Sequence, residues 1–111
     1  MAYDEQLASR IRALIAGEPG LTEQKMFGGL AFLVNGNMSV AASGQGGIML
    51  RVDPDQSESL AESTSAVPFA MRGREMRGWL RVDAHAVRDD AELARWVELG
   101  VAFARSLPAK R

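Results

Sequence analysis

The sequence predicts a two-layer α+β domain, with helices packed on one face of a five-stranded antiparallel sheet. The order of apolar patterns along the chain is helix, three strands, helix, two strands and helix. Short turn signals join neighbouring strand patterns, which is typical of antiparallel pairing. The 111 residues contain no repeat and no linker, so we expect a single domain with one hydrophobic core.

The first helix is predicted to run from Asp4, a good N-cap residue, to about residue 15. Gly17 and Pro19 follow it and end the helical pattern. The apolar positions that fall on one face of this helix are Leu7, Ile11, Leu14 and Ile15.

The middle of the chain changes to the two-residue period of β-strands. Met26–Val34 and Met38–Ala42 lie on either side of Asn35-Gly36. Asn-Gly in this position predicts a hairpin with a type I′ turn, because both central residues of that turn need positive φ. A glycine-rich turn then leads to a third strand at Ile48–Val52. The positions of the second strand that we expect on one face are Met38, Val40 and Ala42.

Other glycines are expected to serve the backbone rather than a ligand, because no phosphate-binding pattern accompanies them. Gly28 and Gly29 precede the regular alternation, so they predict a turn, a bulge or a close approach of two backbones. Gly73 is expected in a turn, and Gly78 at a turn or bulge position.

The second half of the chain begins with a short helix, which Asp53 caps and Pro54 opens. Val67–Met71 predicts a strand, and Pro68 assigns it to a sheet edge because proline has no backbone donor. The next strand is predicted at Met76–Val82. Its expected faces are Met76, Leu80 and Val82 on one side, and Arg77, Trp79 and Arg81 on the other.

The last helix is predicted from Asp89 to about Leu107. Its apolar side chains form two adjacent stripes that together span roughly 200°, whereas a surface helix needs an apolar arc of only about 100°. We therefore expect this helix to contact the sheet and either the first helix or another subunit. The stripes are Leu93, Val97, Gly100, Val101 and Ala104, and Trp96, Leu99 and Phe103.

Charge is unevenly distributed, although the formal net charge is only −1. Residues 71–81 hold four arginines and one glutamate, so this segment carries +3 and the remainder of the chain −4. Strand alternation places Arg77, Trp79 and Arg81 on the sheet face without helices, together with Arg51. Such a group can bind nucleic acid, contact a protein, or simply cover a solvent-exposed surface.

The sequence offers little for catalysis or metal binding. It has no cysteine, which excludes a thiolate zinc site and a cysteine nucleophile. The single histidine, His85, lies in a predicted loop near Asp83 and Asp89, without a recognisable nucleophile motif. We expect no cofactor and no metal. The polar N-terminus and the absence of a long apolar segment predict a cytoplasmic protein that does not contact membranes.

Several motifs carry a family resemblance. Lys25–Phe32 reads KMFGGLAF, Asn35–Met38 reads NGNM, and residues 73–79 read GREMRGW. Together with the last helix, these segments resemble the TfoX N-terminal domain family over almost the whole chain. The resemblance implies the same element order on one antiparallel sheet, as in type III secretion chaperones.

The family resemblance also implies a kind of function. Its named members regulate competence genes for DNA uptake together with a transcription activator, and no enzymatic activity is implied. The sequence ends at Arg111, so the second, C-terminal helical domain of the full-length regulators is expected to be absent.

The leading hypothesis is a non-catalytic interaction domain that forms homodimers or binds a partner protein. One alternative is a weak nucleic-acid-binding domain that uses the basic strand from Arg72 to Arg81. Another is a small-molecule-binding protein or hydrolase. The residues predicted for the contact surface are Lys25, Phe27, Arg74, Arg77, Trp79 and Arg81.

Overall fold

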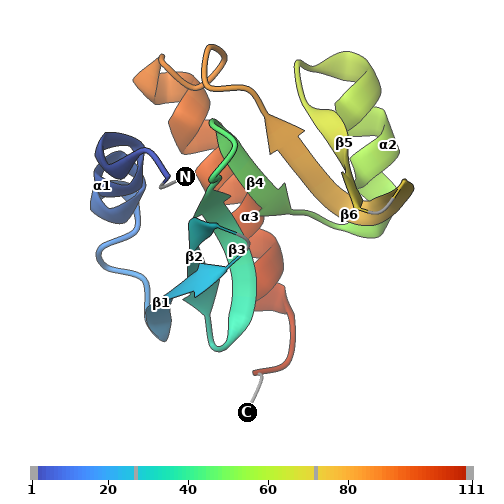
Figure 1. The fold of residues 1–111 in the computed structure, drawn as a ribbon. Coiled ribbons are helices and arrows are strands. Elements are labelled where there is room, and N and C mark those ends of the chain that lie inside the picture. Colours follow the sequence, from blue (N-terminus) through green and yellow to red (C-terminus); the bar gives the residue numbers. More distant parts are fainter. Residues whose placement is uncertain (1–2, 27, 72, 110–111) are drawn as a thin grey trace.

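The computed structural model describes residues 3–26, 28–71 and 73–109 (Figure 1). Within them it confirms the predicted α+β class, with three helices and one antiparallel sheet. The elements in chain order are α1 (Glu5–Leu14), β1 (Leu21–Met26), β2 (Gly29–Val34), β3 (Asn37–Ala42), β4 (Ile48–Arg51), α2 (Pro54–Ser63), β5 (Val67–Met71), β6 (Arg74–Val82) and α3 (Asp90–Ser106).

The sheet has six strands rather than five, in the order β1-β2-β3-β4-β6-β5. The additional strand is β1, which pairs with β2 from Leu21↔Val34 to Met26↔Gly29. The segment predicted as one strand, Met26–Val34, is therefore divided between two. β1 gives no strand signal in the sequence because its four middle residues are all polar and exposed, as is common at a sheet edge.

The helices α1 and α3 cover one face of the sheet, and in Figure 1 α3 passes behind β3 and β4. α2 packs against β6, and its Leu60 and Ala61 contact the same apolar core. Leu14, predicted on the buried face of α1, is instead 47% exposed at the last residue of that helix. The face of the sheet opposite α1 and α3 is called the helix-free face below. Buried members of the core include Ile11, Phe32, Val40, Ile48, Leu50, Leu80, Leu93 and Val97.

The turns between the first strands match their sequence signals. Asn35 and Gly36 have φ angles of 53° and 84°, as the predicted type I′ turn requires. Gly28 has a φ of 75° in the turn between β1 and β2. Gly29 makes the predicted close approach, because a Cβ atom there would collide with the carbonyl oxygen of Ala42.

The predicted face of Met38 is wrong. The register between β2 and β3 shifts after Phe32, which leaves Ser39 without a cross-strand partner. The Ser39 hydroxyl donates a hydrogen bond to the Phe32 carbonyl oxygen at 2.8 Å. One additional residue reverses the alternation, so Met38 packs on the helix-free face while Val40 enters the core.

The β5–β6 hairpin agrees with its predicted turn and edge but not with the predicted face of Met76. Gly73 lies in the turn with a φ of 78°, and β5 is an edge strand, as Pro68 predicts. The pairing register shifts along the hairpin, and Gly78 has a φ of 88° in this region. Leu80 is buried after the irregularity, whereas Met76 before it is 39% exposed. The predicted alternation therefore holds only in the second part of β6.

The wide apolar arc of α3 is used within the chain. Trp96, Val97 and Val101 are buried in the core, and α3 also packs against α1. Phe103, on the second stripe, lies against the guanidinium of Arg51. Both stripes of this helix therefore have intramolecular contacts, with the sheet and with the first helix.

Candidate binding face on the helix-free side of the sheet

The helix-free face has an apolar cluster of its own. Ala31, Met38, Ala41 and Met49 are each at most 6% exposed, although no helical residue belongs to the cluster among the described residues. Strand side chains provide the cover, because Met26, Phe69 and Trp79 pack around the buried members. Met26 comes from the edge strand β1 and Phe69 from the opposite edge strand β5. The sheet is therefore curved toward this face, in keeping with the natural twist of sheets.

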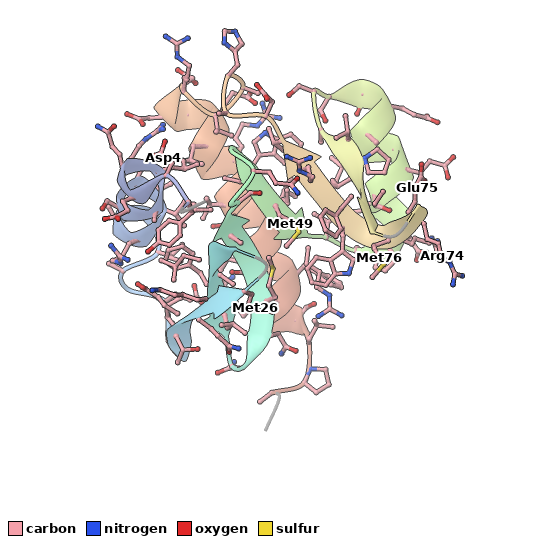
Figure 2. All side chains as sticks on the ribbon, in the orientation of Figure 1. Asp4, Met26, Met49, Arg74, Glu75 and Met76 are labelled. Carbon is pink, nitrogen blue, oxygen red and sulfur yellow. The ribbon has the colours of Figure 1, made fainter. Side chains whose placement is uncertain are left out.

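The curvature leaves a cleft of about 460 Å³, which we call the methionine cleft. In Figure 2 the Met26 and Met49 sulfur atoms lie close together over the middle of the sheet. Both edge strands contribute to its walls, as does the turn between β3 and β4. Its lining residues are Met26, Gly29, Ala41, Ala42, Ser43, Gln45, Met49, Val67, Pro68, Phe69, Ala70 and Arg81.

An arginine lies against two aromatic rings beside this cluster. The Arg51 guanidinium carbon is 5.5 Å from the ring centre of Trp79 and 5.6 Å from that of Phe103. Arg51 and Trp79 are cross-strand partners on β4 and β6, so the strand register holds the pair together. Within about 6 Å of an aromatic ring, a cation is attracted by the negative face of the π system. The two rings thus hold the Arg51 guanidinium in place at the edge of the helix-free face.

The structure brings two of the predicted contact residues together on the helix-free face. Trp79 packs on the apolar cluster, and Arg81 lines the methionine cleft. Arg81 pairs with Met49 across β4 and β6, and Arg51 with Trp79, two residues further along. These pairs form one continuous surface.

The other predicted contact residues lie elsewhere. Lys25 pairs with Leu30, whose side chain is in the main core, so Lys25 lies on the helix-covered side of the sheet. Arg74 is exposed next to the β5–β6 turn, far from Met26 in Figure 2. Arg77 does not join Trp79 and Arg81, because its guanidinium donates to the Asp55 carboxylate of α2 at 3.0 Å. Phe27 lies outside the described residues.

A second cleft, of about 420 Å³, lies between α2 and the β5–β6 hairpin. Its lining includes Trp79 and Met76, but also Glu58, Glu62 and Glu75. Glu58 and Glu62 share the cleft with Arg77 and offset part of the net positive charge of residues 71–81, in which Glu75 is already counted.

Several contributors to the helix-free face are absent from the predicted contact residues, among them Met49, Arg51 and Phe69. Met49 and Arg51 carry a signal in the sequence, since they alternate with Ile48 and Leu50 on β4. Phe69 carries none, because its position in the cleft depends on β5 pairing beyond β6 rather than with β4.

The residues with displaced pKa values lie on the helix side of the molecule. Hydrogen bonds donated by Arg105 lower the pKa of Glu18 below its ordinary value, and Arg12 has the same effect on Glu23. These are ion pairs that hold elements together, with N–O distances of 2.7 Å and 2.6 Å. They therefore stabilise the fold and lie away from the helix-free face.

Other chemical features are sparse in the part of the chain that the structure describes. His85 is exposed in the loop before α3, where its backbone N–H donates to Asp83 at 2.9 Å. No group of three or more metal-ligating side chains is found in residues 3–26, 28–71 and 73–109. None of the described helices is both long and apolar enough to cross a membrane.

The fold and the face define a class: a small α+β domain whose antiparallel sheet is covered by helices on one side and curved around an apolar surface on the other. The family model of the TfoX N-terminal domain matches residues 13–104 of the 111. The chain belongs to this family, as its KMFGGLAF and GREMRGW segments predict. Curated proteins provide no match to the chain.

Proposed function

We propose that this protein is a non-catalytic interaction domain that binds a partner protein or a second copy of itself through the helix-free face. The observation that carries the proposal is the Arg51–Trp79 stack beside the buried Met38 and Met49, which belong to an apolar cluster without a described helical residue. Tryptophan, arginine and methionine are enriched at protein interfaces, and the first two are also enriched among the residues that dominate binding energy.

The surroundings of the basic strand favour a protein over a nucleic acid as partner. Arg77 is paired with Asp55, and Glu58, Glu62 and Glu75 line the same cleft. These carboxylates would repel a phosphate backbone, whose binding depends on accumulated positive charge. Arg51 already lies against two aromatic rings, an arrangement that suits contact with a protein surface.

The non-catalytic part of the proposal rests on the surroundings of His85. Its side chain is exposed in a loop, and the neighbouring Asp83 carboxylate accepts the backbone N–H of His85, as in a loop turn. A general base needs a partner that orients it and a bound substrate within hydrogen-bond reach. The expected role in competence regulation follows from family membership and stays a prediction.

The test begins with co-purification of the tagged chain from its native cells, followed by mass spectrometry. The captured protein is then purified and its affinity measured by calorimetry, and self-association is measured by sedimentation. We expect Arg51→Ala and Trp79→Ala to weaken the interaction by about tenfold or more, as for central interface residues. Thermal unfolding followed by circular dichroism establishes that both variants are folded.

Arg95→Ala is the matched control, because Arg95 is an exposed arginine of α3 that pairs with Glu92 of the same helix. It should leave the affinity unchanged. A wild-type chain that is monomeric and captures no specific protein would overturn the proposal. Binding that is unaffected by both Arg51→Ala and Trp79→Ala would overturn the assignment to this face. Capture of nucleic acid with a steep dependence on salt would favour the alternative.

A further inference from the structure

The methionine cleft has the dimensions of a small-molecule site. Ligand-binding pockets typically measure about 300–1,000 Å³, and the cleft measures about 460 Å³. Its walls come from all six strands, so it depends on the whole curved sheet rather than on one loop. Rigid elements that converge on one cavity are a common basis for a ligand site.

The walls of the cleft are mainly apolar. Met26, Ala41, Met49 and Phe69 contribute aliphatic, thioether and aromatic surface, and Ala41 and Met49 are 4% and 6% exposed. Methionine side chains are unbranched and polarizable, so they adapt to ligands of different shape. These properties suit the apolar body of a small organic molecule.

One charged side chain lines the cleft within the described chain, and it is Arg81. Five other arginines form ion pairs with carboxylates, whereas Arg81 forms none among the described residues. Arg81 is only partly exposed, on the strand pair that leads to the β3–β4 turn. Ser43 and Gln45 of that turn add polar groups to the lining. The cleft thus combines an apolar wall with one uncompensated cation.

We propose that the methionine cleft binds a small organic anion with an apolar body, of the class of aliphatic carboxylates. The guanidinium of Arg81 would pair with the carboxylate, for which its planar donor pattern is well matched. The hydrocarbon chain would lie between Met26, Met49 and Phe69. The proposal does not depend on the partner protein proposed above, because a small ligand can bind to the chain alone.

The probe is octanoate, titrated into ¹⁵N-labelled protein at pH 7 in about 150 mM salt, where surface charges are screened beyond about 8 Å. We expect saturable shifts of the amide resonances of Gly29, Ala41, Met49 and Ala70. Acetate lacks the apolar body and 1-octanol lacks the charge. Each should therefore bind with an affinity at least about tenfold lower than that of octanoate. Absence of saturable shifts with octanoate would overturn the proposal, as would equal binding of 1-octanol.

Two variants test the two halves of the site. Arg81→Gln removes the charge and should weaken octanoate binding by about tenfold or more. Ala70→Trp places a large side chain at an exposed cleft residue of β5 and should block binding without disturbing the core. Arg95→Gln removes the same charge on α3 and should leave the affinity unchanged. Equal binding by wild type and Arg81→Gln, or by wild type and Ala70→Trp, would refute the assignment.

Discussion

Gly100 determines how closely α3 approaches the sheet. A Cβ atom at this position would lie 2.5 Å from the carbonyl oxygen of Ser39 and 3.6 Å from the Cβ of Leu50. Glycine has a low helix propensity, but at this position its lack of a side chain lets α3 contact the backbone of β3. That contact places Phe103, one turn later in the helix, against Arg51 at the rim of the helix-free face.

Gly100→Ala is expected to destabilise the protein by about 1–3 kcal/mol, the usual cost of excess volume in a packed core. In an exposed helix the same change would stabilise by about 1 kcal/mol, so the sign of the effect reports the close approach. Urea unfolding measures the difference. Gly17→Ala is the control, since a Cβ atom there meets nothing within 4 Å. A Gly100→Ala variant as stable as wild type would contradict the packing described here.

At the scale of elements, Ser57 connects α2 to the irregular part of β6. Its hydroxyl donates to the Pro54 carbonyl oxygen at 3.1 Å and accepts the Gly78 backbone N–H at 3.2 Å. The carbonyl oxygen of Gly78 accepts the N–H of Val52 at 2.8 Å. The buried Ser57 side chain thus supplies a hydrogen-bond acceptor for the Gly78 N–H, which the irregular pairing removes from the strand ladder.

Ser57→Ala should destabilise the protein by about 1–3 kcal/mol, because it leaves the buried N–H of Gly78 without an acceptor. Chemical denaturation gives the free energy, and amide hydrogen exchange should show faster exchange at Gly78. Ser59→Ala lies on the exposed side of the same helix and is expected to change stability by less than about 0.5 kcal/mol. Equal stability of the two variants would contradict the role of Ser57.

Elements with strong local signals were predictable, and those that depend on distant pairing were not. Asp4 and Asp89 cap their helices as expected, with carboxylates that accept backbone N–H groups two or three residues later. β1 was not predictable, because an edge strand with polar residues on both faces has no apolar alternation. The faces of Met38 and Met76 were wrong because irregular pairing in β3 and β6 reverses or interrupts the two-residue period.

At the scale of the whole molecule, ion pairs join segments that are far apart in the sequence. Glu18 follows α1 and pairs with Arg105 near the end of α3, with an N–O distance of 2.7 Å. The Glu18 side chain is only 11% exposed. Since hydrogen bonds from Arg105 lower the pKa of Glu18, this carboxylate stabilises the fold in its charged form.

Stability should therefore decrease in acid. A carboxyl group with a lower pKa in the folded state stabilises the protein fully above its unfolded pKa of about 4.3, and this contribution is lost as the pH falls through the folded pKa. Glu18→Gln should be less stable than wild type at pH 7, and the two should converge on acidification. Arg105→Gln should reduce the pH dependence in the same way. Denaturant unfolding from pH 7 to pH 2.5 measures the curves, and a constant difference would contradict the pairing.

The candidate site was predictable only in part. Trp79 and Arg81 follow the irregular region of β6. In this last part of the strand the alternation is regular, so both residues lie on the predicted, helix-free face. Arg77 and Arg74 precede or flank that region, so alternation does not predict their directions. Lys25 belongs to a motif of the family sequence but lies on the other side of the sheet, since β1 forms a strand of its own.

The sequence by itself determined the caps, the type I′ turn at Asn35-Gly36, the edge position of β5 and the family. Each of these rests on a residue and its near neighbours, or on a matched motif. Only the tertiary structure decided that Met26 and Phe69, from opposite edges of the sheet, line one cleft with Arg81. The physical reason is that twist and irregular pairing accumulate across all six strands, and no local pattern encodes their sum.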